Sequence, residues 1–263
     1  MLSPGRPRIV TFVFSLVLLT ALAESTPANA QTDADISGQG LISGAVVNPC
    51  TPGSRDSSCQ DGSDAVFRLS AASSQAFGFT VFQHVVRLRE AKTRRELGGA
   101  FLRDWMKSVS NTGRTWDDGG KFFTNYVAHP MGGGVYAHIY RQNDQARTRL
   151  EPGESGYGGM VTRAMVFTAV VSVQFELGPV SEASIGNVGM RNPTKMAWVD
   201  LVITPVLGTA WMVGEDVLDE RLLKQMDGAN TVLRNTLRFV LNPARSGANL
   251  SRRKWPWFRE RDD

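Results

Sequence analysis

Apolar residues recur at helical spacing along much of the chain, and this pattern predicts a mainly α-helical fold. Over residues 73–97 the apolar side chains repeat every three or four positions, at Phe77, Val81, Val85 and Leu88, before Gly98-Gly99. Similar patterns predict helices at 101–109, 122–129, 135–140, 207–226 and 231–240, with a separate apolar run at 198–203 before Pro205. Glycine- and proline-marked loops separate these segments, so we expect one compact multi-helix domain over residues 64–250.

Residues 160–177 are apolar on nearly every side, which is typical of a helix buried in a protein core or in lipid. The run has Arg163 near one end and Glu176 near the other, and its length is borderline for a membrane span. Because valine, phenylalanine and threonine dominate it, a β-strand is an alternative to the helix. A protein that spans the membrane through 160–177 and 198–214 is a further alternative.

The first 30 residues follow the pattern of a cleavable signal peptide. Arg6 and Arg8 precede an apolar run from Ile9 to Ala23, and Ala28-Asn29-Ala30 provides a cleavage site. The apolar run is short for a membrane anchor, and no cysteine follows it that could carry a lipid. We therefore expect export to the periplasm or the outer membrane, with cleavage after Ala30 or, alternatively, after Ala23.

Residues 31–63 are polar and rich in glycine, and they predict a flexible leader. This segment holds both cysteines of the chain, Cys50 and Cys59. In an oxidising compartment two cysteines in such a loop most simply form a disulfide. The pair agrees with the export that the signal peptide predicts.

The distribution of charged residues indicates a partner only at the C-terminal end of the chain. The 29 basic and 25 acidic residues leave a net charge of +4, which by itself implies no nucleic-acid partner. In the tail, residues 251–263, cations alternate with aromatic residues, notably Arg252, Arg253, Trp255 and Trp257. That mixture suits contact with a membrane surface or an envelope protein; alternatively, the tryptophans pack onto the domain.

Several polar side chains interrupt the apolar segments and are candidates for chemistry. These are Asn125, His129, Glu176, Glu182, Asp200 and Glu215, the last followed by Asp216 and Asp219. If they converge, they could form an acid–base site around His129 or a site in which His and carboxylates bind a metal. Otherwise such carboxylates are solvated, cap a helix or pair with arginine. The spacing of Glu215, Asp216 and Asp219 favours partial exposure, because like charges three or four residues apart repel.

Established catalytic motifs are missing from the sequence. It contains no Gly-x-Ser-x-Gly, no His-Glu-x-x-His, no phosphate-binding loop and no Cys-x-x-Cys, so we assign no metal ligand and no cofactor from it. Pro130 suits the first turn of a helix, and the following run Gly132-Gly133-Gly134 is interpreted as a place where another element packs closely.

The segment from Asn125 to Gly133, followed by Tyr136, resembles the Asn-Tyr-x-x-His-Pro-x-x-Gly signature of an uncharacterised family of exported bacterial proteins. Later blocks are similar as well: Phe175-Glu176 with Ser181-Glu182, and Thr204-Pro205 through Gly208 to Gly214-Glu215. The resemblance covers residues 118–219. It implies that Asn125, His129, Glu176, Glu182, Asp200 and Glu215 form one polar cluster, and it implies no activity.

These patterns favour an exported, envelope-associated helical protein with a structural or binding role at a membrane. The alternative is a membrane-proximal hydrolase that acts on a lipid or cell-wall substrate. In that alternative His129 is the base, and Glu182 or Glu215 orients it or binds a metal.

Overall fold

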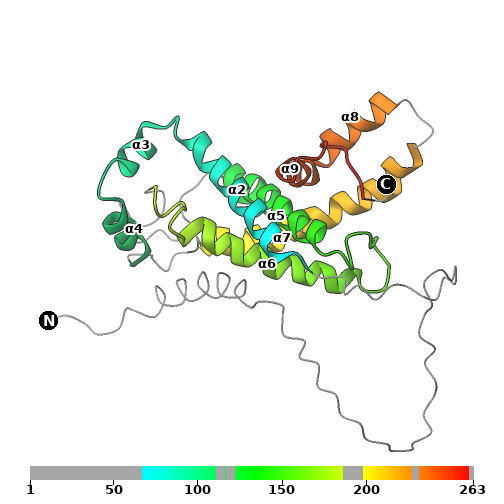
Figure 1. Ribbon diagram of the computed structural model, residues 1–263, viewed down its shortest axis with the longest axis horizontal. Helices are drawn as coiled ribbons and strands as arrows, with labels where there is room; N and C mark the ends of the chain where they lie inside the picture. The colour runs from blue at the N-terminus through cyan, green and yellow to red at the C-terminus, as the bar shows by residue number, and fades with distance from the viewer. Residues whose placement is uncertain (1–66, 111–115, 117–121, 186–197, 227–230, 261–263) are drawn as a thin grey trace, which may run out of the picture.

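The computed structural model describes residues 67–110, 116, 122–185, 198–226 and 231–260 (Figure 1). Within these residues the chain forms eight α-helices and no strand, which confirms the mainly α fold. The elements in chain order are α2 (Leu69–Arg87), α3 (Ala91–Leu97), α4 (Phe101–Ser110), the π-helical turn η1 (Thr124–Ala128), α5 (His129–Asn143), α6 (Tyr157–Leu177), α7 (Trp198–Leu218), the π-helical turn η2 (Asp219–Leu223), the 3₁₀ turn η3 (Lys224–Met226), α8 (Thr231–Leu241) and α9 (Pro243–Ser251). The predicted signal peptide, leader and Cys50–Cys59 disulfide lie outside the described residues.

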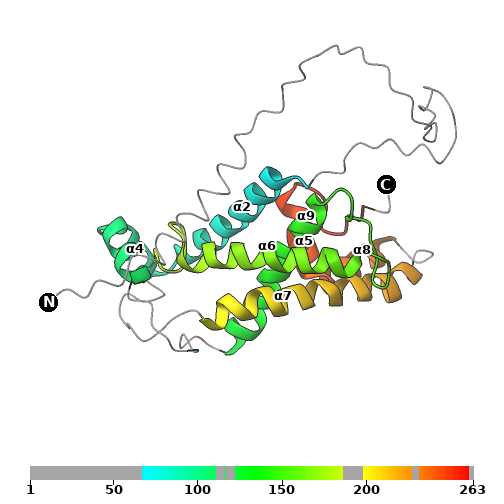
Figure 2. The same cartoon turned by 90° about the horizontal axis from the view of Figure 1, so that it is seen from below.

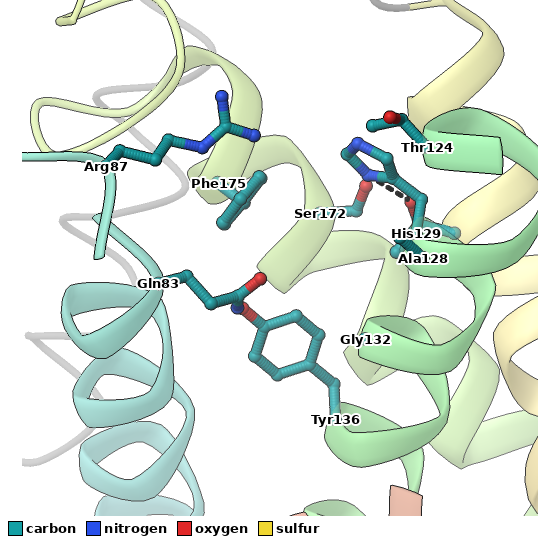
Figure 3. A pocket seen from close by; sticks show the side chains of 10 residues that line it. Gln83, Arg87, Thr124, Ala128, His129, Gly132, Tyr136, Ser172 and Phe175 are labelled. Atoms are coloured by element: carbon teal, nitrogen blue, oxygen red, sulfur yellow. Dashed lines mark hydrogen bonds between the residues drawn. The ribbon is translucent and has the colours of Figure 1, made fainter. Parts of the chain in front are cut away.

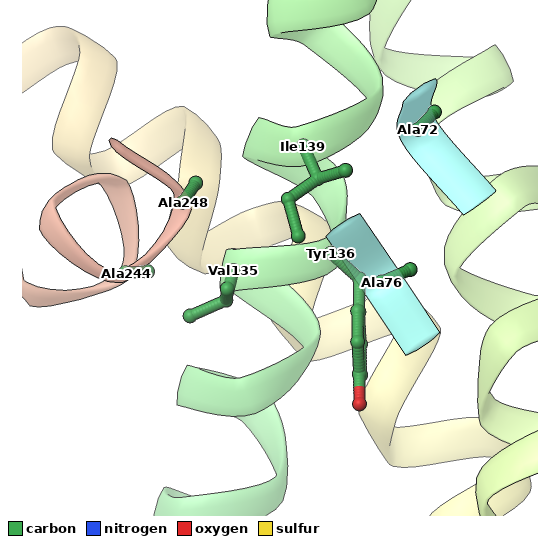
Figure 4. Close-up of a cluster of buried hydrophobic side chains, with 7 residues drawn as sticks. All are labelled: Ala72, Ala76, Val135, Tyr136, Ile139, Ala244 and Ala248. Carbon is green, nitrogen blue, oxygen red and sulfur yellow. The ribbon is translucent and has the colours of Figure 1, made fainter. Parts of the chain in front are cut away.

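Helix α5 occupies the centre of the molecule, crossing α6 and α7, which run side by side (Figure 2). Every residue from 133 to 141 is buried. Helices α2 and α9 pack on α5, and small side chains from both meet its larger ones (Figure 4). This cluster consists of Ala72 and Ala76 from α2, Val135, Tyr136 and Ile139 from α5, and Ala244 and Ala248 from α9.

Glycines bring α5 and α7 into backbone contact. A Cβ atom on Gly133 would lie 2.1 Å from the carbonyl oxygen of Thr204, and one on Gly208 would lie 2.6 Å from the Cα of Gly133. Only glycine allows so close an approach. The interpretation of the glycine run as a packing site is therefore confirmed at Gly133 and Gly134, but Gly132 has open space where its side chain would be.

Helix α6 confirms the helical alternative for residues 160–177, and the β-strand alternative is wrong. Both α6 and the continuous helix from Trp198 to Leu223 are long and apolar enough to cross a membrane. They also form the core of the domain, with α5 packed against both. Core helices of soluble proteins meet the same criterion, so this property does not establish a membrane span.

Two predicted helix boundaries were wrong, and one helix was not predicted. The single helix expected over 73–97 divides into α2 and α3, because Arg94 donates hydrogen bonds to the carbonyl oxygens of Leu88 and Arg89 and closes a turn there. Pro205 lies inside α7 rather than between two segments. Helix α9 was not predicted, since its nine residues contain only one large apolar side chain, Leu250; Pro243 fits its first turn.

Candidate functional site

A small pocket lies where α2, η1, α5, α6 and α7 meet (Figure 3). Its volume is about 90 Å³, and its wall is formed by Gln83, Arg87, Thr124, Ala128, His129, Gly132, Tyr136, Ser172, Phe175 and Thr204. Gln83 and Tyr136 point toward each other, and the Gln83 amide donates a 3.1 Å hydrogen bond to the Tyr136 hydroxyl. Burial raises the pKa of Tyr136 above its usual range, so this hydroxyl stays protonated. The wall of the pocket therefore contains a neutral hydroxyl beside the Gln83 amide.

His129 lies on this wall between two buried carboxylates. Its Nδ1 is 4.0 Å from Oε1 of Glu176, and its Nε2 is 3.8 Å from Oδ1 of Asp200. The His129 side chain is 13% exposed, whereas the carboxylates are 1% and 3% exposed. The three residues come from α5, α6 and α7, so the crossing of these helices positions them.

Local structure explains how each of these side chains reaches the site. The π-helical turn η1 runs directly into His129, the first residue of α5, and Pro130 fits the first turn as expected. Asp200 lies in the first turn of α7, where the helix dipole favours a negative charge. Glu176 lies in the last turn of α6, where the dipole disfavours it, so its burial requires compensation from elsewhere in the site.

Neighbouring side chains hold the imidazole ring and Asp200. The Thr204 hydroxyl lies 3.5 Å from Nδ1 of His129, and the Phe175 ring packs edge-on against the imidazole. Ser172 donates a 3.3 Å hydrogen bond to the backbone carbonyl of Asp200. Asn125 is buried in η1, one helical turn before His129.

Glu182 lies beyond Phe175, in a second group with two residues of α2. Its carboxylate is 3.1 Å from Arg87 and 3.8 Å from Nε2 of His84. His84 donates its Nδ1 proton to the carbonyl of Thr80, which points Nε2 toward the carboxylate. The Phe175 ring contacts both His84 and His129 and separates the two groups.

Glu215 belongs to a different part of the molecule. It accepts hydrogen bonds from His138 at 3.1 Å, from Trp211 at 2.9 Å and from the backbone N–H groups of Ala244 and Arg245 at 2.8 Å each. The carboxylate therefore caps the start of α9. Burial alone would raise the pKa of Glu215, but the hydrogen bonds from His138 and the backbone lower it. Burial also lowers the pKa of His138, so the ring is neutral and donates.

Asp216 and Asp219 lie in an arginine-rich network next to Glu215. Asp216 pairs with Arg141 and Arg245 and accepts a 2.7 Å hydrogen bond from the Tyr157 hydroxyl. Asp219 accepts two hydrogen bonds from Arg259, at 2.8 and 2.9 Å. Burial would raise the pKa of both carboxyl groups, but Arg245 and the other arginines lower it.

The expectation that Glu215, Asp216 and Asp219 are partly exposed is wrong, because all three are buried. Their repulsion is offset by hydrogen bonds and by cations from α5, α9 and the tail. The sequence suggested capping and arginine pairing as alternatives, and both occur here.

The tail is held on the domain by Arg259 and by hydrogen bonds from Asn249 to the carbonyl oxygens of Pro256 and Phe258, and it leaves other side chains exposed. Arg259 is buried against Asp219, whereas Trp255 is 70% exposed and stacks on Trp257 with ring centroids 5.4 Å apart. Arg253 is also exposed, and Arg252 pairs with Glu260. The alternative in which the tryptophans pack onto the domain is wrong for Trp255.

The structure therefore divides the six residues that the resemblance placed in one cluster. It brings His129, Glu176 and Asp200 together, places Glu182 on the other side of Phe175 and places Glu215 with His138. Sequence reasoning gave His84 and His138 no role and overlooked the arginines. The spacing of three between His84 and Arg87, on one helical face, was a usable signal.

No protein-family model, no curated protein and no solved structure matches the chain. The class of the molecule is therefore defined by its structure alone: a helical domain with a buried group of one histidine and two carboxylates beside a pocket.

Proposed function

We propose that the protein is an exported, envelope-associated helical protein that binds the surface of an anionic membrane. The observation that carries this proposal is the exposed aromatic and basic tail, which continues directly from an apolar groove. Lys254 is exposed beside Arg253 and Trp255, and its ammonium lies 4.4 Å from the centroid of the Phe258 ring. Tryptophan at headgroup depth and cations facing anionic lipid are the expected partners of such a surface.

The groove lies between α2 and α9 and has a volume of about 380 Å³. Its wall is formed by Ser74, Gln75, Gly78, Phe79, Phe82, Gly247, Leu250 and Ser251. Leu250 and Ser251 end α9 just before the basic residues of the tail. An acyl chain in the groove would therefore place its anionic headgroup toward the tail.

Exposed apolar side chains continue from the groove along α2. Phe77, Phe82 and Val85 are each at least half exposed, as is Leu250 on α9. Soluble monomers rarely leave adjoining apolar side chains uncovered to this extent. A lipid surface would cover these side chains, with the tail supplying the electrostatic attraction.

Vesicle binding tests the proposal, with neutral phosphatidylcholine vesicles compared with vesicles that also contain phosphatidylglycerol. Deletion of the tail is unsuitable, because it removes Arg259 from the buried Asp219. The better variant combines Arg253→Glu with Lys254→Glu, and its control combines Arg103→Glu with Lys107→Glu on α4. We expect the tail variant to lose at least about 30-fold in affinity for anionic vesicles, since each basic residue near the surface contributes about 1 kcal/mol and each glutamate adds repulsion.

A second substitution tests the groove. Phe82→Ser should weaken binding to both kinds of vesicle by about tenfold, because a phenylalanine ring contributes about 1.5–3 kcal/mol on burial. Equal binding of the wild type to neutral and anionic vesicles would contradict the electrostatic part of the proposal. Unchanged vesicle binding by both variants would contradict the proposal that the tail and the groove bind a membrane.

A second candidate is a membrane-proximal hydrolase for a lipid or cell-wall substrate, and the position of His129 favours it. A histidine held between carboxylates on the wall of a pocket can act as a general base. Glu176 and Asp200 replace Glu182 and Glu215 in this role, because they are the carboxylates nearest the ring. Glu215 is engaged in capping α9.

Ester-lipid and peptidoglycan hydrolysis by the purified protein tests this candidate. If the wild type hydrolyses either substrate, His129→Gln should lower the rate by about 10²–10⁴-fold. The matched control is His84→Gln, which removes the other histidine beside Phe175 and should retain most of the rate. Equal rates for His129→Gln and wild type would reject His129 as the base, and no turnover of either substrate would reject the candidate.

A further inference from the structure

We propose that His129, Glu176 and Asp200 bind one divalent transition-metal ion at the wall of the pocket. One ligand atom from each of the three residues lies within 4.8 Å of the other two. One imidazole and two carboxylates suit Zn²⁺, Mn²⁺ or Fe²⁺. The site requires neither membrane binding nor hydrolysis, and it goes beyond both functions.

The spacing of the three side chains is close to that of a metal site. Ligand atoms at about 2.0–2.2 Å from an ion lie about 3–4.4 Å apart, depending on the angle between them. The spacing of up to 4.8 Å is slightly wider than this range. Rotation of one carboxylate side chain would bring the three ligand atoms within this range. The three helices bring these side chains together, but Glu176 faces Nδ1 of His129 and Asp200 faces Nε2, so one carboxylate must turn toward the nitrogen that the other faces.

The charges of the group also favour a cation. Two carboxylates that are buried side by side repel, and each loses hydration that must be replaced. The position of Glu176 at the negative end of α6 adds to this cost. A divalent ion between the two carboxylates would interact favourably with both negative charges at once.

Of the three residues, His129 lines the pocket, so water can reach the site from the histidine side. The pocket volume of about 90 Å³ exceeds the roughly 10–15 Å³ that one water molecule requires. Three protein ligands with water completing the shell are typical of catalytic rather than structural metal sites. Thr204, whose hydroxyl faces Nδ1 of His129, provides the kind of outer contact that orients a ligating imidazole.

The other histidine–carboxylate groups of the described residues are poor cation sites by comparison. Arg87 lies 3.1 Å from Glu182 beside His84, so this carboxylate already pairs with a fixed cation, although Arg87 also lines the pocket beside His129. Glu215 beside His138 is engaged by backbone donors, and Arg245 pairs with the neighbouring Asp216. The histidine of the proposed site instead has two carboxylates against it.

Metal content and metal titration of the purified full chain test the proposal. The protein is stripped with a chelator, dialysed and titrated with Zn²⁺ and, separately, with Mn²⁺ in a calorimeter. The variants are His129→Gln, Glu176→Gln and Asp200→Asn. The control is Glu182→Gln, a buried carboxylate of the neighbouring group that should retain the site.

We expect the wild type and the control to bind one ion per chain and the three variants to bind it more than about 100-fold more weakly, since even an outer-shell change costs 10–100-fold. Circular dichroism establishes whether each variant is folded. For the wild type, spin-echo spectroscopy of bound Mn²⁺ should show one coordinated imidazole nitrogen, a result that needs no variant. Absence of saturable binding, or equal binding by all three variants, would overturn the proposal whatever the vesicle and hydrolysis assays show.

Discussion

The two ends of helix α7 carry buried carboxylates in contrasting surroundings. At the start, Asp200 lies with Glu176 and His129 beside a pocket. At the end, Asp216 and the adjoining Asp219, the first residue of η2, are enclosed by arginines and hydrogen-bond donors. The residue types are the same, so the difference lies in the partners. A carboxylate surrounded by fixed cations holds elements together, whereas a carboxylate beside histidine and a cavity can bind or react.

The network at the end of α7 joins parts of the chain that are distant in sequence. Arg141 from α5 pairs with Asp216, Arg259 from the tail pairs with Asp219, and Arg245 from α9 pairs with both aspartates. We therefore expect the largest effects on stability there. The His129 group should affect ligand binding more than folding.

The largest effect is expected for Asp219→Asn. The substitution leaves the buried Arg259 without its carboxylate, and breaking a buried ion pair in this way costs about 3–5 kcal/mol. The free energy of unfolding, measured with urea, tests this. As a control, Glu151→Gln removes the partly buried partner of the exposed Lys224 and should cost less than about 1 kcal/mol. Similar losses in the free energy of unfolding for the two variants would mean that the network of arginines and aspartates does not stabilise the fold.

A smaller effect is expected at the crossing that positions His129. In Gly208→Ala the new methyl group would overlap the backbone of Gly133, so we expect a loss of about 1–3 kcal/mol. Because α5 and α7 must then separate, binding of Mn²⁺ to the His129 group should weaken as well. Gly214→Ala, in open space on the same helix, should instead stabilise by about 0.4–1 kcal/mol. Equal stabilities of the Gly208→Ala and Gly214→Ala variants in urea denaturation would contradict the close crossing of α5 and α7.

The helices could be predicted from the sequence because apolar periodicity is a local property. Residues 160–177 and 231–240 matched α6 and α8 to within a few residues. The glycine run before Val135 was also informative, since adjacent glycines in a helix suggest close packing. The π-helical turns η1 and η2 were not predictable, because they depend on how α5 and α7 pack.

The partners of each polar side chain could not be read from the sequence. Glu176 and Glu182 are close in sequence, yet only Glu176 lies against His129. Glu215 and His138 pair although 77 residues separate them. These choices depend on the angles at which α5, α6 and α7 cross, which periodicity does not determine. The arginines were overlooked for the same reason: each acts on a carboxylate far away in the chain.

The pH dependence of stability should separate His138 from the carboxylates of the network. Because burial lowers the pKa of His138, its contribution is complete above the unfolded value of about 6.5 and declines as the pH falls below it. The pKa values of Asp216 and Asp219 are also lowered, so their contribution is complete above their unfolded value of about 4 and is lost at lower pH. We expect two successive losses on acidification.

The variant His138→Gln tests the first of these losses. It should remove a slope of up to about 1.4 kcal/mol per pH unit below pH 6.5 and leave the loss below about pH 4 in place. Urea denaturation across this range, with a chelator present to exclude metal effects, measures both. An unchanged slope near pH 6 would mean that His138 does not titrate as its burial requires.

The smallest effect is expected for Asp200→Asn without metal, the counterpart of Asp219→Asn at the other end of α7. The substitution relieves repulsion with Glu176 but loses about 0.3–1 kcal/mol of favourable interaction with the start of the helix, so the net change should stay within about 1 kcal/mol. With Mn²⁺ at about 100 times its Kd, the wild type should gain about 2.7 kcal/mol and the variant almost nothing. A loss of several kcal/mol without metal would make Asp200 a structural residue like Asp219, and the contrast between the two ends of α7 would fail.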